Sequence, residues 1–147
     1  MISKGFTLVE ILVVMVLFAI LGSMIFASVG KSRGDRQNKD FVRAFVALSH
    51  KAQRKAVAEG RPVHIRIAET LRECWIDGGK KRLKIPEALL IEAEGRGRME
   101  EGFFTFSFYP DGSSDGVTLT FTAGDLFAAS IRIDMLTGLV GKVADAQ

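Results

Sequence analysis

Cysteine, histidine, tryptophan and proline are scarce in this 147-residue sequence, which contains one, two, one and three of them respectively. The lone Cys74 excludes an internal disulfide and any metal site built from several cysteines. His50 and His64 lie in no motif that pairs a nucleophile with a base, so we expect no catalytic residues and no enzyme activity. The net charge is only +3, which predicts no polyanionic partner by itself.

Charge is also nearly absent from residues 6–29, where Glu10 is the one charged side chain. A helix of this length is roughly 36 Å long, enough to cross the ~30 Å hydrocarbon layer of a membrane. A secretory signal peptide is the alternative, but its apolar core is only about 7 to 15 residues long. Lys4 precedes the apolar run, which favours a cytoplasmic N-terminus.

Glu10 is unusual in such a run, because an acid inside the bilayer costs about 2.5 to 3.5 kcal/mol and normally needs a partner. Its carboxyl group could stay at the headgroup level, take up a proton, or pair with a group from another chain. The surrounding segment, Lys4-Gly5-Phe6-Thr7-Leu8-Val9-Glu10, resembles the type IV prepilin signal of pilins and type II secretion pseudopilins.

This resemblance implies that a prepilin peptidase cuts between Gly5 and Phe6 and methylates the new amine of Phe6. It also implies that the amine pairs with Glu10 of a neighbouring subunit in a filament, which sets the register of the helices. Residues 1–5 are then a leader peptide, and residues 6–29 form the transmembrane and filament-core helix. The implied partners are the peptidase, inner-membrane lipid, and other major and minor pseudopilins or pilins.

The segment 30–60 is predicted to be a joint followed by an amphipathic helix. Two glycines and two cations at residues 30–34 favour a flexible joint. Beyond it, apolar residues recur every three or four positions up to the Gly60 and Pro62 stop signals, at Phe41, Phe45, Leu48, Ala52 and Ala56. The polar face carries a basic group that we interpret as solvated charge, with a lipid or nucleic-acid contact as the alternative: His50, Lys51, Arg54 and Lys55.

Residues 61–147 predict an antiparallel β-rich head of about six or seven short strands. Apolar residues alternate clearly at 63–67, 104–108, 117–121 and 127–133, and more weakly at 71–76, 89–92 and 139–143. Turn signals separate these runs at Pro110-Asp111-Gly112, Ala123-Gly124-Asp125 and Thr137-Gly138. The predicted fold class is therefore α+β and pilin-like: a long N-terminal helix, transmembrane and then amphipathic, packed on an antiparallel β-sheet or β-sandwich head.

Three segments of the head resemble the GspH/FimT family of minor pseudopilins: residues 52–63, 108–116 and 133–140. The resemblance implies a structural subunit of the periplasmic pseudopilus of a type II secretion system, processed and N-methylated by a prepilin peptidase. It implies a single-pass protein of the inner membrane with its head in the periplasm. No cofactor is expected.

Gly95-Arg96-Gly97-Arg98 is the one local signal for a polyanion. FimT-like relatives that bind DNA carry a Gly-Arg-x-Arg element near the C-terminus, whereas residues 138–141 here read Gly-Leu-Val-Gly. We therefore interpret the internal copy as an exposed loop. The alternative is a FimT-like minor type IV pilin that binds DNA through Arg96 and Arg98, or that acts in pilus assembly or natural transformation.

Oxygen ligands for calcium, which some secretion pseudopilins bind, could come from the segment 111–115. Asp111, Ser113, Ser114 and Asp115 lack the regular ligand order of a calcium loop, and turn geometry already explains Asp111, so we predict no metal. Cys74 is expected to be a small buried side chain. We expect His64 at the surface or on a sheet edge, and the phenylalanines of 104–108 in the core.

Overall fold

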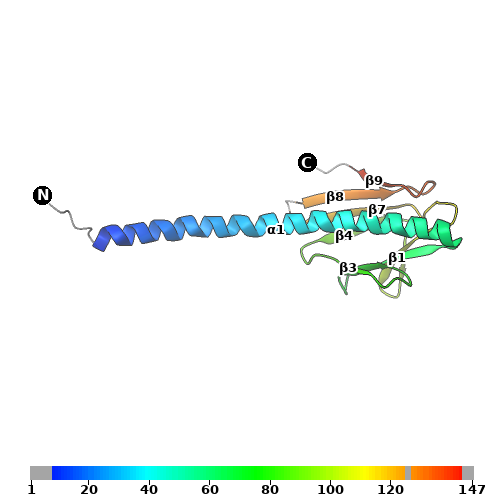
Figure 1. Ribbon diagram of the computed structural model, residues 1–147, viewed down its shortest axis with the longest axis horizontal. Coiled ribbons are helices and arrows are strands. Elements are labelled where there is room, and N and C mark those ends of the chain that lie inside the picture. Colours follow the sequence, from blue (N-terminus) through cyan, green and yellow to red (C-terminus); the bar gives the residue numbers. More distant parts are fainter. Residues whose placement is uncertain (1–7, 125–126, 144–147) are drawn as a thin grey trace. The chain divides into compact units, whose positions relative to one another are not determined.

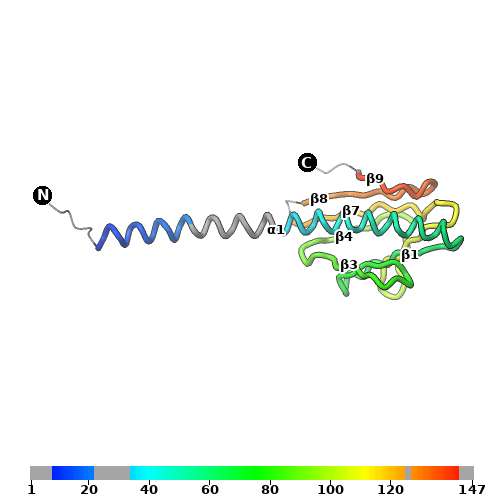
Figure 2. Tube along the Cα trace, in the orientation of Figure 1, coloured from blue at the N-terminus to red at the C-terminus, as the bar shows by residue number. Residues whose placement is uncertain are grey.

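The structure is a computed structural model that describes residues 8–124 and 127–143, except for the side chains of residues 22–33 and 143. Within these residues it contains one helix, α1 (Leu8–Glu59), and nine strands. The chain divides into two units, Met1–Gly34 and Asp35–Gln147, which are described separately below. Figure 2 marks the residues that lie outside the description.

The first unit is helical from Leu8 onward, in agreement with the long apolar run. Residues 30–34 are also assigned to α1, so the two glycines there do not end the helix. The boundary between the two units nevertheless falls at Gly34, and flexibility at the joint stays a prediction. Within the described part of the chain, no helical stretch is both long enough and apolar enough to span a membrane.

The second unit begins with the amphipathic segment of α1, which ends at Glu59 as predicted. Gly60 follows with a φ of 63°, a conformation that glycine adopts without strain at a helix C-terminus. One face of this segment is buried, and its members recur at helical spacing: Asn38, Phe41, Val42, Phe45, Leu48, Ser49, Ala52 and Ala56.

The strands form two antiparallel sheets, as predicted for the head. Sheet A has the order β3 (Arg82–Lys84), β2 (Glu73–Ile76), β1 (Val63–Ala68), β6 (Phe103–Phe108) and β5 (Arg98–Glu100). Sheet B has the order β4 (Leu90–Gly95), β7 (Val117–Ala123), β8 (Phe127–Ile133) and β9 (Val140–Val143). Figure 1 shows the C-terminal part of α1 running across the strands, with β7 and β8 to one side and β1 and β3 to the other.

A single hydrophobic core joins the helix to both sheets. Phe45 is fully buried, and its ring centroid lies 6.3 Å from that of Phe41 on the same helix and 5.8 Å from that of Phe121 on β7. Phe106 and Phe108 on β6 are also fully buried, so these phenylalanines belong to the core as predicted. Aromatic pairs at such separations add to the stabilisation that burial provides.

Two strands were missed in the sequence, and both are three residues long. β3 pairs with β2 and β5 pairs with β6, each at an edge of sheet A. Alternation over three residues is too short to predict a strand, so pairing with a longer neighbour defines them. β2 also starts later than expected, because Leu71 is exposed and Arg72 has a φ of 52°.

Cys74 on β2 is fully buried, as predicted, and burial raises the pKa of its thiol to about 12. The reactive thiolate is therefore very rare at neutral pH. We expect iodoacetamide to label the native chain at pH 8 at least about a hundredfold more slowly than the chain unfolded in denaturant. Because there is one cysteine, mass spectrometry of the chain gives the labelled fraction directly. Rapid labelling of the native chain would contradict this burial.

Gln53 on α1 connects two turns of the head that were predicted from the sequence. Its side-chain Nε2 donates hydrogen bonds to the carbonyl oxygens of Gly112, at 3.0 Å, and Thr137, at 2.8 Å. Gly138 lies at this junction with a φ of 61°, and a Cβ there would come within 2.3 Å of the Gly112 carbonyl oxygen. The segments 108–116 and 133–140 therefore meet at one point on the helix.

Gly138→Ala should destabilise the head by about 2 to 4 kcal/mol, because it adds a steric clash to the strain of a positive φ. Gly60→Ala is the matched control, since Gly60 has a φ of 63° but a Cβ added there would meet no atom within 4 Å. That control should lose only about 1 kcal/mol. Denaturant unfolding of both variants measures the difference, and equal losses would show that the junction around Gln53 is not closely packed.

Candidate functional site

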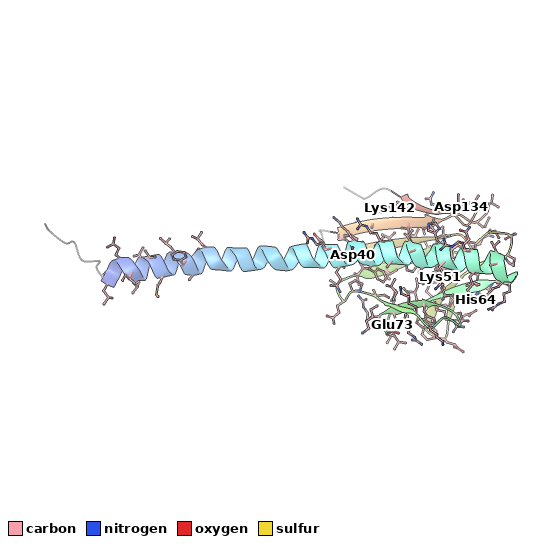
Figure 3. The ribbon with its side chains drawn as sticks, in the orientation of Figure 1. Asp40, Lys51, His64, Glu73, Asp134 and Lys142 are labelled. Atoms are coloured by element: carbon pink, nitrogen blue, oxygen red, sulfur yellow. The ribbon has the colours of Figure 1, made fainter. Side chains whose placement is uncertain are left out.

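The first candidate site is the surface of α1 over residues 8–21, where every side chain is exposed. Figure 3 shows these side chains standing away from the helix on several sides. Twelve of the fourteen are large and apolar: Leu8, Val9, Ile11, Leu12, Val13, Val14, Met15, Val16, Leu17, Phe18, Ile20 and Leu21. Burial of each would contribute about 1.5 to 3 kcal/mol, and exposed apolar surfaces of this extent mark sites of interaction with proteins or membranes.

Glu10 is the one acidic residue in the first turn of α1, and it is exposed. Gly5 and Phe6, the predicted processing residues, lie outside the described residues. The pairing of Glu10 with a neighbouring amine therefore stays a prediction.

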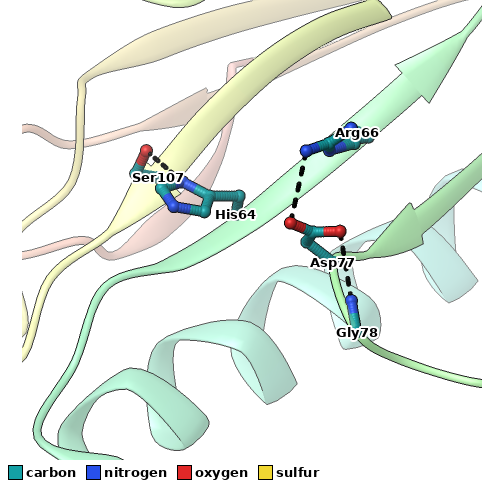
Figure 4. Close-up of polar contacts among 5 residues, drawn as sticks. All are labelled: His64, Arg66, Asp77, Gly78 and Ser107. Atoms are coloured by element: carbon teal, nitrogen blue, oxygen red, sulfur yellow. Dashed lines mark hydrogen bonds and ion pairs between the residues drawn. The ribbon is translucent and has the colours of Figure 1, made fainter.

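The second candidate site is a polar bay on the outer face of sheet A, with a volume of about 350 Å³. His64 and Arg66 contribute to it from β1, and Ser107 from β6. The Nδ1 atom of His64 lies 2.9 Å from the Ser107 hydroxyl oxygen, and Arg66 Nη2 donates to Asp77 Oδ2 over 3.3 Å (Figure 4). His64 was predicted at the surface or on a sheet edge. It is half-buried on β1, the middle strand of sheet A, so the edge position was wrong.

Asp115 also lines this bay, and its carboxylate accepts hydrogen bonds from two donors. Its carboxylate accepts from the Ser107 backbone N–H at 2.7 Å and from the Tyr109 hydroxyl at 2.6 Å. The bond to the carboxylate raises the pKa of Tyr109, because it favours the protonated phenol. Both oxygens of the Asp115 carboxylate are therefore already hydrogen-bonded to groups of the same chain.

Asp111, the other acid considered for calcium, is engaged in its own turn. Its Oδ1 accepts from the Ser113 hydroxyl at 2.6 Å and from the Ser113 backbone N–H at 3.0 Å. These bonds lower the pKa of Asp111, because they favour the charged carboxylate. In the described residues, no three Cys, His, Asp or Glu side chains come together as a metal site.

Gly95-Arg96-Gly97-Arg98 is a crossing between the sheets and not simply an exposed loop. Gly95 ends β4 in sheet B and Arg98 begins β5 in sheet A. A Cβ on Gly95 would lie 2.3 Å from the Gly116 carbonyl oxygen, and one on Gly97 would lie 2.1 Å from the Phe104 ring. Close packing therefore accounts for both glycines without a phosphate ligand.

The two arginines of this crossing lie in different surroundings. Arg96 and Arg98 are both exposed, but only Arg98 lines the bay. No pattern in the sequence indicated the bay itself, because its residues come from strands far apart in the chain. The one available signal was that polar residues such as His64 and Ser107 alternate with core residues on predicted strands.

Part of the basic helix face borders a groove of about 320 Å³. Lys51 and Lys55 lie along it with Lys80 and Lys81, above apolar side chains such as Leu48. Lys55 also forms an ion pair with Glu59 at 3.8 Å. The prediction of fully solvated charge is therefore too simple for Lys55, which is half-buried.

The chain is similar to known proteins in its N-terminal motif and in part of its sequence. Residues 1–26 match the family described as Prokaryotic N-terminal methylation motif. A curated relative, Type II secretion system protein H of Aeromonas hydrophila, is 38% identical over 67 residues. That match covers 46% of this chain and 37% of the relative, so the chain spans well under half of the relative's length.

Solved structures with the same fold come from two kinds of protein. The minor pseudopilin EpsH from the type II secretion system of Vibrio cholerae matches with a TM-score of 0.59 and 15% identity, over 77% of this chain and 97% of EpsH. The type IV minor pilin FimU of Pseudomonas aeruginosa matches with a TM-score of 0.58 and 11% identity, over 76% and 94%. At these identities the likeness establishes the fold alone.

The fold and the N-terminal motif define a pilin-like α+β protein with a prokaryotic methylation motif. Within that class, part of the sequence is similar to a type II secretion H protein, and the fold is shared with the minor pseudopilin EpsH. The predicted N-terminal methylation motif and the predicted pilin-like fold are thus confirmed.

Proposed function

We propose that the chain is a minor pseudopilin, a structural subunit of the periplasmic pseudopilus of a type II secretion system. The observation that carries this proposal is the apolar surface of residues 8–21, exposed on all sides with Glu10 at its N-terminal end. A surface of this kind needs lipid in storage and other helices in a filament. The methylation motif over residues 1–26 supports the same role.

Processing would convert the helix from its stored form in the membrane to a form that can assemble into a filament. In this proposal a prepilin peptidase removes residues 1–5 on the cytoplasmic side of the inner membrane and methylates the amine of Phe6. The amine and Glu10 of adjacent subunits then neutralise each other as the helices stack. A misplaced subunit would leave a charge unpaired in an apolar environment, so the pair selects one register.

The head would act by its shape in the periplasm, without catalysis or a cofactor. Its hydrogen-bonded carboxylates, such as Asp111 and Asp134, hold turns together. The relatives of this fold are named as pseudopilins and pilins, which supports a structural subunit. Its partners would be the major and minor pseudopilins that contact α1.

Mass spectrometry of the native chain, extracted from membranes, tests this proposal. We expect a mature protein that begins at Phe6 and carries one added methyl group on its amine. Cells that lack the prepilin peptidase serve as the control, and they should retain the chain with Met1. An intact Met1 in normal cells, or a start near residue 30, would contradict the proposal.

A minor type IV pilin that engages DNA is the second candidate, and the fold match with FimU supports it. The two candidates differ in a mobility-shift assay with duplex DNA and the purified chain in neutral detergent. DNA uptake predicts binding that weakens with salt and is lost in Arg96→Ala and Arg98→Ala together. Absence of binding at low salt favours the secretion role.

A further inference from the structure

We propose that the bay on the outer face of sheet A binds the C-terminal carboxylate of a partner peptide. This site is separate from α1 and does not depend on the proposed role in secretion. Its central residues are Arg66, Thr105 and Arg98. His64 and Ser107 form a second row beside them.

The strand register places these side chains together. Thr105 on β6 is the direct partner of Arg66 on β1 and of Arg98 on β5. Adjacent strands are about 4.8 Å apart, so the two arginines flank the hydroxyl from strands roughly 10 Å apart. Two guanidinium groups at this spacing can approach one carboxylate from opposite sides.

Two donors of this bay have no acceptor among the described residues. Thr105 is only 7% exposed, and its Oγ1 has no hydrogen-bond partner. The buried Nε of Arg66 also has no hydrogen-bond partner among the described residues. A buried polar group without a partner is costly, by about 1 to 3 kcal/mol, so each of these atoms requires an explanation, and a bound ligand supplies one. Both atoms are shielded from water, and we expect the exposed Arg98 to shift when a ligand enters.

Asp77 and Asp115, two of the three acids of the bay, do not use up these donors. Asp77 accepts from Arg66 Nη2 and from the Gly78 N–H, and Asp115 accepts from Ser107 and Tyr109. Arg66 bonds Asp77 through Nη2, so its Nε remains without an acceptor among the described residues. The unused capacity of the bay therefore consists mainly of donors, which suit a ligand with acceptor oxygens.

The size of the bay and the position of its two arginines favour a single carboxylate over a polyanion. Two arginines and three acids line it, including Glu100, so its formal charge is −1 when His64 is neutral. These acids repel any anion, so a nucleic-acid backbone is excluded, and one carboxylate can bind only between the two arginines. One carboxylate at the end of a short peptide fits a volume of about 350 Å³ and can be held by directional, bidentate bonds.

Trp75 provides a direct readout, because it is the single tryptophan of the chain and pairs with Arg66 across β1 and β2. The probe is acetyl-triglycine with a free carboxylate, added to the full chain in neutral detergent. We expect a saturable change in tryptophan fluorescence that the amide-capped peptide does not produce. Calorimetry with the same two peptides provides an independent measurement.

Matched variants assign the binding to the bay. Arg98→Gln should weaken it about tenfold, and Thr105→Val roughly fivefold, because each removes a donor. Arg96→Gln is the control: it removes the same charge from an exposed arginine that does not line the bay, and it should change nothing. Glu100→Gln should tighten binding, because it removes a like charge.

Three results would overturn the proposal. The first is equal binding of the amide-capped peptide, which would exclude recognition of the carboxylate. The second is saturable binding of inorganic phosphate or duplex DNA with no binding of the peptide. The third is no saturable binding up to about 10 mM peptide in either fluorescence or calorimetry.

Discussion

Glu10→Leu is expected to leave the chain in the membrane and to abolish its incorporation into filaments. Leucine makes the apolar surface of residues 8–21 more continuous, so insertion should be unaffected or improved. In the proposed filament, however, the substitution leaves the amine of Phe6 in a neighbouring subunit without its counter-charge. Removal of one partner from a buried ion pair costs about 3 to 5 kcal/mol, equivalent to more than a hundredfold in association.

The measurement is co-purification of the variant with the other pseudopilins, compared with its amount in the membrane fraction. Glu10→Gln separates charge from size, because it keeps the shape of the side chain, and it should fail to assemble in the same way. Leu12→Met is the control on the same exposed helix surface, and it should assemble normally. Normal co-assembly of Glu10→Leu would remove the ion pair from the proposed mechanism.

Phe45→Ala is expected to destabilise the head by about 3 to 5 kcal/mol, the range for a fully buried phenylalanine. Phe45 has no exposed surface and contacts Phe41 and Phe121, so its removal opens a cavity where the helix meets sheet B. Domains of this size are stable by only about 5 to 15 kcal/mol, so much of that margin would be lost.

Denaturant unfolding followed by Trp75 fluorescence measures this effect. Val57→Ala is the control on the same helix, where the side chain is 53% exposed, and it should change stability by less than about 0.5 kcal/mol. A loss below about 1 kcal/mol for Phe45→Ala would contradict the central place of this residue in the core.

These two variants should have opposite consequences. Glu10→Leu should prevent assembly while the head keeps its stability, because residues 8–21 contribute no side chain to the core. Phe45→Ala should destabilise the head while the apolar helix still enters the membrane. Together they separate the part of the chain proposed to join subunits from the part that folds the head.

Much of the fold could be predicted from local patterns. The helical spacing of Phe41, Phe45 and Leu48 identified the face of α1 that is buried, because a helix repeats every 3.6 residues. The longer strands were also predicted, since alternation over five or more residues defines one inner and one outer face. β1, β6, β7 and β8 are the examples.

The parts that failed depend on neighbours that are distant in the chain. β3 and β5 exist as strands because longer strands pair with them, and three residues carry no periodicity of their own. Gly95 and Gly97 look like a flexible phosphate loop in the sequence. In the fold they are places where the backbone approaches Gly116 and the Phe104 ring too closely for a side chain.

The sequence by itself determined the N-terminal methylation motif and the long apolar run with Glu10, since both are contiguous features that need no folding to be read. Only the tertiary structure decided which polar side chains share a surface. Arg66, Thr105 and Arg98 meet because β1, β6 and β5 are adjacent in sheet A. Strand order and register are set by the packing of the whole core, and no local pattern specifies them.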